Sequence, residues 1–92
     1  MKRERPLTSK QKEFLALIPR DGVILWLTKP SSRFAVFAGG ELTDIGTGWG
    51  PTLESLYYRG VVNAYYGDEE IPEAHRSEWD DARRFKCEVG KP

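Results

Sequence analysis

The spacing of hydrophobic residues near the start of the chain predicts a helix over 8–18. Apolar side chains recur there at mostly helical spacing, and lysine and glutamate occupy the positions between them. Thr8 and Gln11 have the spacing of a capping box, in which each side chain bonds to the backbone N–H of the other residue. Pro19 ends the helix, because the residue before a proline is pushed out of the α region.

The next segments predict a β-hairpin followed by a glycine-rich loop. The apolar runs 23–28 and 33–38 have the length of strands and are joined by four turn residues, which is typical of a hairpin. Residues 39–50 include five glycines, and each interior glycine costs a helix roughly 1 kcal/mol relative to alanine. We therefore expect a loop there, with at most a short strand over 41–44.

A second helix is predicted over 51–59, because Pro51 suits its first position and Gly60 suits the left-handed residue that ends a helix. Its Leu53 and Leu56 share one face, which we expect to pack against Phe14 and Ile18. Three further segments follow: a strand at 61–66, a long acidic loop at 67–82 with a short helix within 72–81, and a closing strand at 84–89. The expected fold class is α+β, in the order helix–hairpin–helix–strand–long loop–strand.

Composition indicates one small folded domain. The 92 residues suit a single domain, and the 12% of aromatic residues can build a modest core. One cysteine excludes an internal disulfide. No apolar run approaches the roughly 20 residues of a membrane span, and no signal peptide is evident. We expect a basic N-terminal arm at 1–6, a single domain at 7–92 and a cytoplasmic location.

The net charge of zero hides an uneven distribution of charge. Residues 1–46 carry eight basic and five acidic residues, whereas residues 47–92 carry six basic and nine acidic ones. Seven of the carboxylates lie within 68–81. Because a nucleic-acid-binding protein presents a basic face, DNA binding requires the basic half to lie on the face of helix 51–59 and the acidic stretch to lie away from it.

One segment is more specific than the rest of the sequence. It is Thr-Leu-Glu-Ser-Leu-Tyr-Tyr-Arg-Gly-Val-Val at 52–62. Leucines three residues apart anchor a helix, Arg-Gly closes it, and two valines open a strand. The string resembles the junction of recognition helix and wing in winged helix-turn-helix domains, and residues 7–18 resemble their opening helix. The helix that normally precedes the recognition helix is not evident, and the predicted wing loop 67–82 is long and acidic.

The resemblance implies a small regulator of transcription, or an accessory protein, that binds double-stranded DNA. The candidate contacts on the helix are Thr52, Ser55, Tyr58 and Arg59. Basic residues of the hairpin and of the last strand are expected to add phosphate contacts: Lys29, Arg33, Arg83, Arg84 and Lys86. Arg59 has a second explanation, because a cation at the end of a helix can satisfy the last carbonyls and the helix dipole.

A protein–protein interaction module is the alternative function, either as a homodimer or with another protein. Six aromatic residues can form a binding face or pack in the core: Trp26, Trp49, Tyr57, Tyr58, Tyr65 and Tyr66. We expect Tyr58 and Tyr66 to remain exposed, and tyrosine is enriched at interfaces.

We expect no enzyme activity, no metal and no cofactor, because no motif for them is recognised. The glycine-rich stretch 46–50 lacks the Lys-Ser/Thr pair of a phosphate loop. His75 lies among carboxylates whose spacing selects no metal. Cys87 alternates with Phe85 and Val89, which favours a small buried hydrophobe over a nucleophile.

Overall fold

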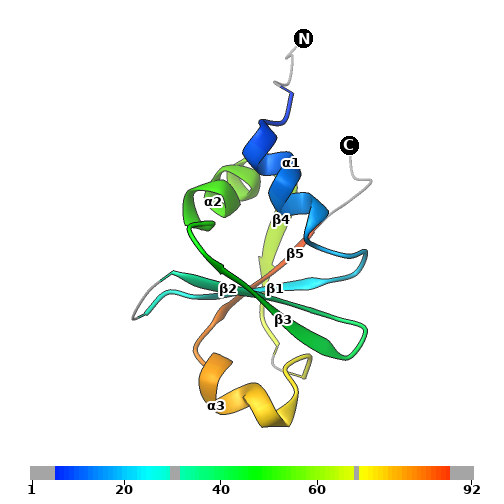
Figure 1. Ribbon diagram of the computed structural model, residues 1–92, viewed down its shortest axis with the longest axis vertical. Coiled ribbons are helices and arrows are strands. Elements are labelled where there is room, and N and C mark those ends of the chain that lie inside the picture. Colours follow the sequence, from blue (N-terminus) through cyan, green and yellow to red (C-terminus); the bar gives the residue numbers. More distant parts are fainter. Residues whose placement is uncertain (1–5, 30–31, 68, 88–92) are drawn as a thin grey trace.

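A five-stranded antiparallel sheet forms the centre of the structure, a computed structural model that describes residues 6–29, 32–67 and 69–87. Two helices cover one face of the sheet and short helices cover the other (Figure 1). The elements in chain order are α1 (Ser9–Ala16), β1 (Val23–Leu27), β2 (Arg33–Ala38), β3 (Glu41–Thr47), α2 (Gly50–Arg59), β4 (Val62–Tyr65), the 3-10 helix η1 (Glu73–His75), α3 (Arg76–Trp79) and β5 (Arg83–Cys87). In space the strands follow the order β3-β2-β1-β5-β4. The fold class is therefore α+β, as predicted.

Helix α1 begins as the sequence predicts and ends earlier. The Thr8 hydroxyl accepts a bond from the backbone N–H of Gln11, and the Gln11 side chain accepts one from the N–H of Thr8, which confirms the capping box. The helix ends at Ala16 rather than at residue 18. The N–H groups of residues 17 and 18 bond to carbonyls three residues back, so the last turn tightens before Pro19.

The predicted hairpin is confirmed, but the loop expected over 39–50 is wrong for most of its length. β1 and β2 pair antiparallel, and β3 continues the sheet beyond β2 over seven residues. Gly39 and Gly40 form the tight turn between them, with φ of 61° and 83°. Gly46 is accommodated because β3 is an edge strand and because its pairing with β2 shifts register between Phe34 and Ala35 of β2.

The second half of the chain returns to the same sheet. α2 has Pro51 in its first turn and ends at Gly60, whose φ is 86°, so both predicted boundary signals are confirmed. β4 covers 62–65 of the predicted strand 61–66. β5 begins one residue before the predicted strand 84–89 and inserts between β1 and β4. Residues 88–89 of that prediction lie outside the described residues.

The acidic stretch contains the short helix that the sequence predicts within 72–81. It contains η1 and α3, which pack on the face of the sheet opposite α1 and α2 (Figure 1). Ile71 and Trp79 are buried there against Val23 and Leu25. The observed order therefore differs from the predicted one by the added strand β3.

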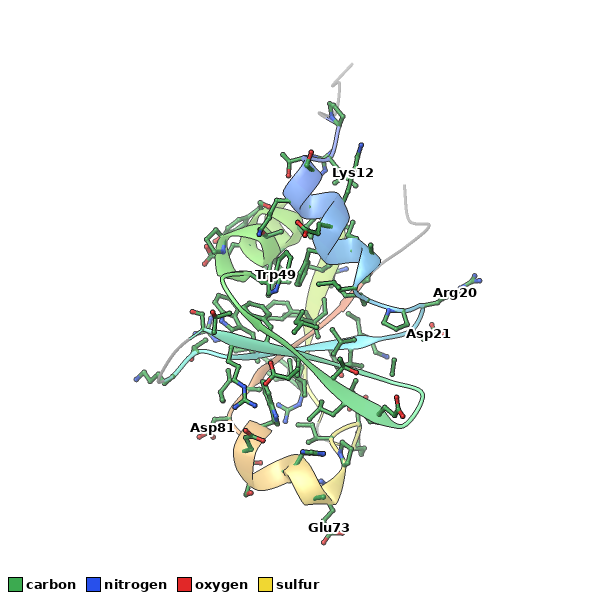
Figure 2. All side chains as sticks on the ribbon, in the orientation of Figure 1. Lys12, Arg20, Asp21, Trp49, Glu73 and Asp81 are labelled. Atoms are coloured by element: carbon green, nitrogen blue, oxygen red, sulfur yellow. The ribbon has the colours of Figure 1, made fainter. Side chains whose placement is uncertain are left out.

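The larger core lies between the sheet and the two longer helices. Leu53 and Leu56 of α2 are fully buried in one cluster with Phe14 and Ile18, which confirms the predicted packing. Trp49 lies in the same cluster, between α2 and the sheet (Figure 2), with its ring 5.1 Å from that of Phe14. In the described ranges, no helix combines the length and the apolar character that crossing a membrane requires.

Candidate functional site

An open groove of about 530 Å³ lies beside α2, where β4 ends and β5 begins. Side chains of α2, the end of β1, the end of β4 and residues 80–85 line it. Its aromatic members are Trp26, Tyr57, Tyr58, Tyr65, Tyr66 and Phe85. Ligand pockets in proteins have volumes of about 300–1,000 Å³, so this groove is large enough to hold several side chains of a partner.

The sequence builds the groove from one anchored helix and one small strand residue. The buried Leu53 and Leu56 fix α2 on the core, so the positions after Leu56 turn Tyr57 and Tyr58 toward solvent. Ala64 pairs with Phe85 across β4 and β5. Because its side chain is a single methyl group, Ala64 leaves space above the sheet that a larger residue would fill.

The aromatic rings of the groove support each other and remain accessible. Tyr57 packs edge-to-face on Phe85 with ring centres 5.9 Å apart, and Tyr58 packs on Tyr57 at 5.5 Å. Tyr58 is 82% exposed and Tyr66 is fully exposed, as predicted. Tyr57 and Tyr58 are held by neighbouring rings while much of their surface still faces water, so a partner can bury them at a low cost in side-chain entropy.

Trp26 contributes a buried polar atom to the same groove. Its ring stacks on Phe34 at 5.3 Å, and its indole Nε1 is buried with no hydrogen-bond partner among the described residues. Trp49 makes a contrast, because its Nε1 donates to the carbonyl oxygen of Ile45 at 3.0 Å. A buried donor without an acceptor is costly, and this N–H has almost no surface open to a ligand, whereas the Trp26 side chain still lines the groove.

The charged residues of the groove do not form a basic surface. They are Glu54, Asp80, Asp81, Arg83 and Arg84. The guanidinium of Arg83 lies over the ring of Trp26 at 5.8 Å, and Arg84 donates to the carbonyl oxygen of Ala82 at 3.0 Å. With three carboxylates against two guanidiniums, the groove is poorly suited to phosphate, whose binding depends on the number of cations presented.

The candidate DNA contacts on α2 differ in accessibility. Thr52 is buried, with 8% of its surface exposed. The Ser55 hydroxyl accepts a bond from Nε2 of Gln11 and donates to the carbonyl oxygen of Thr52, both at 2.8 Å. Tyr58 is exposed, and Arg59 is partly buried at the helix end. Of the four, Tyr58 is the one that lines the groove.

The candidate phosphate contacts are divided between the two faces of the sheet. Arg83 lies on the α2 side, over Trp26. Arg33 and Lys86 lie on the α3 side, where Arg33 stacks on Trp79 and Lys86 lies over Tyr65. Arg84 is also on the α3 side, because it pairs with Leu25 and Tyr65, and it is bonded to the backbone. Lys29 is exposed after β1. The structure therefore does not bring these five cations together.

Arg33 instead joins three elements of the fold. It donates to Oδ2 of Asp44 on β3 at 2.7 Å and to Oε1 of Glu78 on α3 at 2.6 Å. Partial burial by itself raises the pKa of Asp44, but bonds from the Gly46 N–H and from Arg33 outweigh it and lower that pKa below 3.8. The arginine is thus engaged in holding α3 against the sheet.

The structure also places the other segments and residues that the sequence singled out. The stretch 46–50 runs from the end of β3 into the first turn of α2, and Gly50 lies close to Trp26. His75 is exposed at the end of η1, and the neighbouring Glu73 points away from the sheet (Figure 2). In the part of the chain that the structure describes, no three His, Cys, Asp or Glu side chains could hold a metal ion. Cys87 is partly buried against the larger core.

The sequence predicts that tyrosines of the groove are exposed, but it does not predict the groove itself. Ala64, Glu54 and Asp80 lie in different segments of the chain, and no spacing in the sequence indicates that they meet. The available signal for the strand is its alternation, with Ala64 and Tyr66 on one face and Tyr65 on the other. That alternation does not indicate that α2 leaves this end of the sheet open. No protein-family model, curated protein or solved structure matches the chain.

Proposed function

We propose that this chain is a protein-interaction module that holds a segment of a partner protein in the groove beside α2. The observation that carries the proposal is the gathering of exposed tyrosines around one groove that Trp26 also lines. Tyrosine and tryptophan are enriched among the residues that contribute most to protein–protein binding.

A peptide segment suits both kinds of group that the groove offers. Its side chains can cover Tyr58 and Tyr66, which are the most exposed large rings among the described residues. Peptide N–H groups can donate to the groove carboxylates Glu54 and Asp81, which the backbone of DNA cannot do because it has no hydrogen-bond donor.

DNA binding by α2 is the second candidate, and one observation favours it. Most of the acidic segment, with η1 and α3, covers the opposite face of the sheet from α2 (Figure 1), although Asp80 and Asp81 line the groove beside α2. The face with α1 and α2 therefore keeps Lys10, Lys12 and Arg59, with Lys12 directed away from the sheet (Figure 2). Lys10 lies over the ring of Trp49 at 4.5 Å, and the acidic Glu54 lies on the same face.

The winged-helix architecture is proposed together with this second candidate, DNA binding. It is supported by the junction of α2, Gly60 and β4, and by the pairing of β4 with β5 on either side of the predicted wing loop. Strand β3 stands before α2, where that architecture has its second helix. The proposal of a protein-interaction module does not depend on this architecture.

The test is to select peptides from a random display library on the full chain and to measure their affinity for matched variants. Tyr58→Ala with Tyr66→Ala removes the two most exposed rings, and the loss should be at least about tenfold, or about 1.4 kcal/mol. Leu17, an exposed apolar residue that follows α1 and lies outside the groove, gives the control Leu17→Ala, which should bind like the wild type. Equal binding by all three proteins, or no enriched peptide, contradicts the proposal.

The same proteins distinguish the second candidate. Fluorescence anisotropy with a mixed-sequence DNA duplex at about 50 mM salt detects non-specific binding where it is strongest. The protein-interaction module predicts no binding. Binding that weakens steeply with added salt, and that falls when Lys10 and Lys12 become alanine, supports the DNA function instead.

A further inference from the structure

The charges of the groove beside α2 indicate the chemistry of the segment that it holds. We propose that this segment is basic, and that an arginine or lysine side chain of the partner lies on the ring of Tyr58 beside the carboxylate of Glu54. The inference rests on the proposed function, because it concerns the same groove. It goes further by naming the chemistry of the partner, since exposed tyrosines alone suit apolar, polar and basic segments alike.

Helix α2 brings an acidic and an aromatic side chain together on one wall of the groove. Glu54 and Tyr58 are four residues apart, so they are neighbours on the helix surface, and both are exposed and line the groove. The other charged residue of α2 is Arg59, which is partly buried at the helix end and does not line the groove. The α2 wall is therefore negatively charged beside its exposed ring.

The carboxylates of the groove are not neutralised by ion pairs within the protein. Glu54, Asp80 and Asp81 are all exposed and line the groove. None of them forms an ion pair with another side chain in the part of the chain that the structure describes. Asp81 lies where α3 leads into β5 (Figure 2), so carboxylates reach the groove from this connection as well as from α2.

The two guanidiniums of the groove are engaged with other groups of the protein. Arg83 lies over the ring of Trp26 at 5.8 Å. Arg84 donates to the carbonyl oxygens of Ala82 and Asp80 at 3.0 and 3.5 Å. Because neither cation pairs with a carboxylate among the described side chains, the acidic groups of the groove stay open to a partner.

A cation of the partner gains two attractions on the α2 wall. The face of a tyrosine ring carries partial negative charge and attracts a cation within about 6 Å of its centre. Because Glu54 is a neighbour of Tyr58 on the helix surface, a guanidinium or ammonium group over the ring also lies near a carboxylate. An acidic segment is repelled by the same carboxylate, and an apolar segment covers that charge without pairing it. The groove therefore discriminates in favour of a basic segment.

The selection of peptides on the full chain gives the first measurement. Arginine or lysine should be enriched over the input library at one shared position, and aspartate and glutamate should be depleted. The affinity of the tightest peptide should fall as salt rises from about 50 to 500 mM, because exposed charge pairs are screened.

A charge reversal tests the contact with Glu54. Glu54→Lys should weaken binding of the tightest selected peptide at least about tenfold, because attraction becomes repulsion. Replacing the shared basic residue of the peptide by glutamine should remove most of this difference, which is the coupling that a double-mutant cycle measures. Glu13→Lys makes the same change at an exposed position of α1 outside the groove, and its affinity should stay within about twofold of the wild type.

Two substitutions of Tyr58 separate the ring face from apolar burial. Tyr58→Phe keeps the ring and should bind the same peptide within about twofold of the wild type. Tyr58→Leu keeps an apolar side chain without a ring and should lose about threefold or more.

Three results overturn the inference: enrichment of peptides without basic residues, an effect of Glu54→Lys no larger than that of Glu13→Lys, or equal binding by the two Tyr58 variants. Peptides that bind in the groove but carry no cation leave the proposed function standing and refute this inference alone. If no peptide is enriched, the proposed function fails and the inference fails with it.

Discussion

Replacing Leu56 by alanine tests whether α2 is fixed to the core in the way that the groove requires. Leu56 is fully buried in the larger cluster, next to Leu53 and Phe14. The change removes three carbon groups, which at about 0.8 kcal/mol each amounts to about 2.4 kcal/mol of lost transfer free energy. The cavity left behind adds to this, so we expect a loss of about 3–5 kcal/mol in the free energy of unfolding.

This loss is large against the stability of so small a protein. A chain of this length has a free energy of unfolding of about 5–14 kcal/mol, and each kcal/mol shifts the melting temperature by about 4–8 °C. Urea unfolding followed by circular dichroism measures the difference. Leu17→Ala, on the exposed end of α1, is the control and should change stability by less than about 1 kcal/mol. A loss below about 1 kcal/mol for Leu56→Ala would show that the helix is not packed as described.

Three further predictions concern caps, bonds and charge. Ser55→Ala leaves the buried Gln11 amide without its acceptor and should cost about 1–2 kcal/mol in urea unfolding, whereas the Ser55→Thr variant should retain part of this. Gly60→Ala forces an alanine to a φ of 86° and should cost about 1 kcal/mol in urea unfolding, and an unchanged stability would contradict the left-handed cap. The folded-state pKa of Asp44 lies below the unfolded value of 3.8. The Asp44 carboxylate therefore stabilises the fold above that pH, and this contribution is lost as the pH falls through the folded-state pKa. Asp44→Asn should therefore flatten the acid limb of the stability–pH curve, by no more than about 1 kcal/mol because the side chain is largely exposed, and an unchanged acid limb would contradict the role of this ion pair.

Local signals in the sequence predict the elements whose boundaries depend on neighbouring residues. The capping box at Thr8, the proline at 51 and the glycine at 60 fix the ends of two helices through bonds and backbone angles that involve only a few residues. The hairpin of β1 and β2 follows from two apolar runs and a short turn. Each of these predictions is confirmed because the physical cause lies within about ten residues of chain.

Strand β3 shows why other parts of the fold are not predicted. Its glycines argue against regular structure when the segment is considered alone. The strand forms because β2 offers an unpaired edge, and because the turn at Gly39 and Gly40 returns the chain to that edge. The stability of β3 is thus supplied by a partner strand rather than by its own composition.

Part of the candidate site can likewise be predicted from local sequence, and part cannot. The exposure of Tyr58 and Tyr66 is predicted from their positions on a helix and at a strand end, and the structure confirms it. The separation of Arg33 and Lys86 from α2 is not predicted, because it depends on which face of the sheet each strand residue occupies and on where α3 packs. The meeting of Trp26 with the tyrosines depends on the position of β1 in the sheet order.

The most direct test of the proposed function is the indole N–H signal of Trp26 in a ¹⁵N–¹H NMR titration with a selected peptide. The account predicts that the Trp26 Nε1–H signal moves markedly on binding, because a peptide that fills the groove changes the surroundings of the Trp26 ring. The Trp49 signal is the internal reference and should stay nearly fixed, since that N–H is already bonded to Ile45. Saturable peptide binding that moves the Trp49 signal and leaves the Trp26 signal in place would contradict the account.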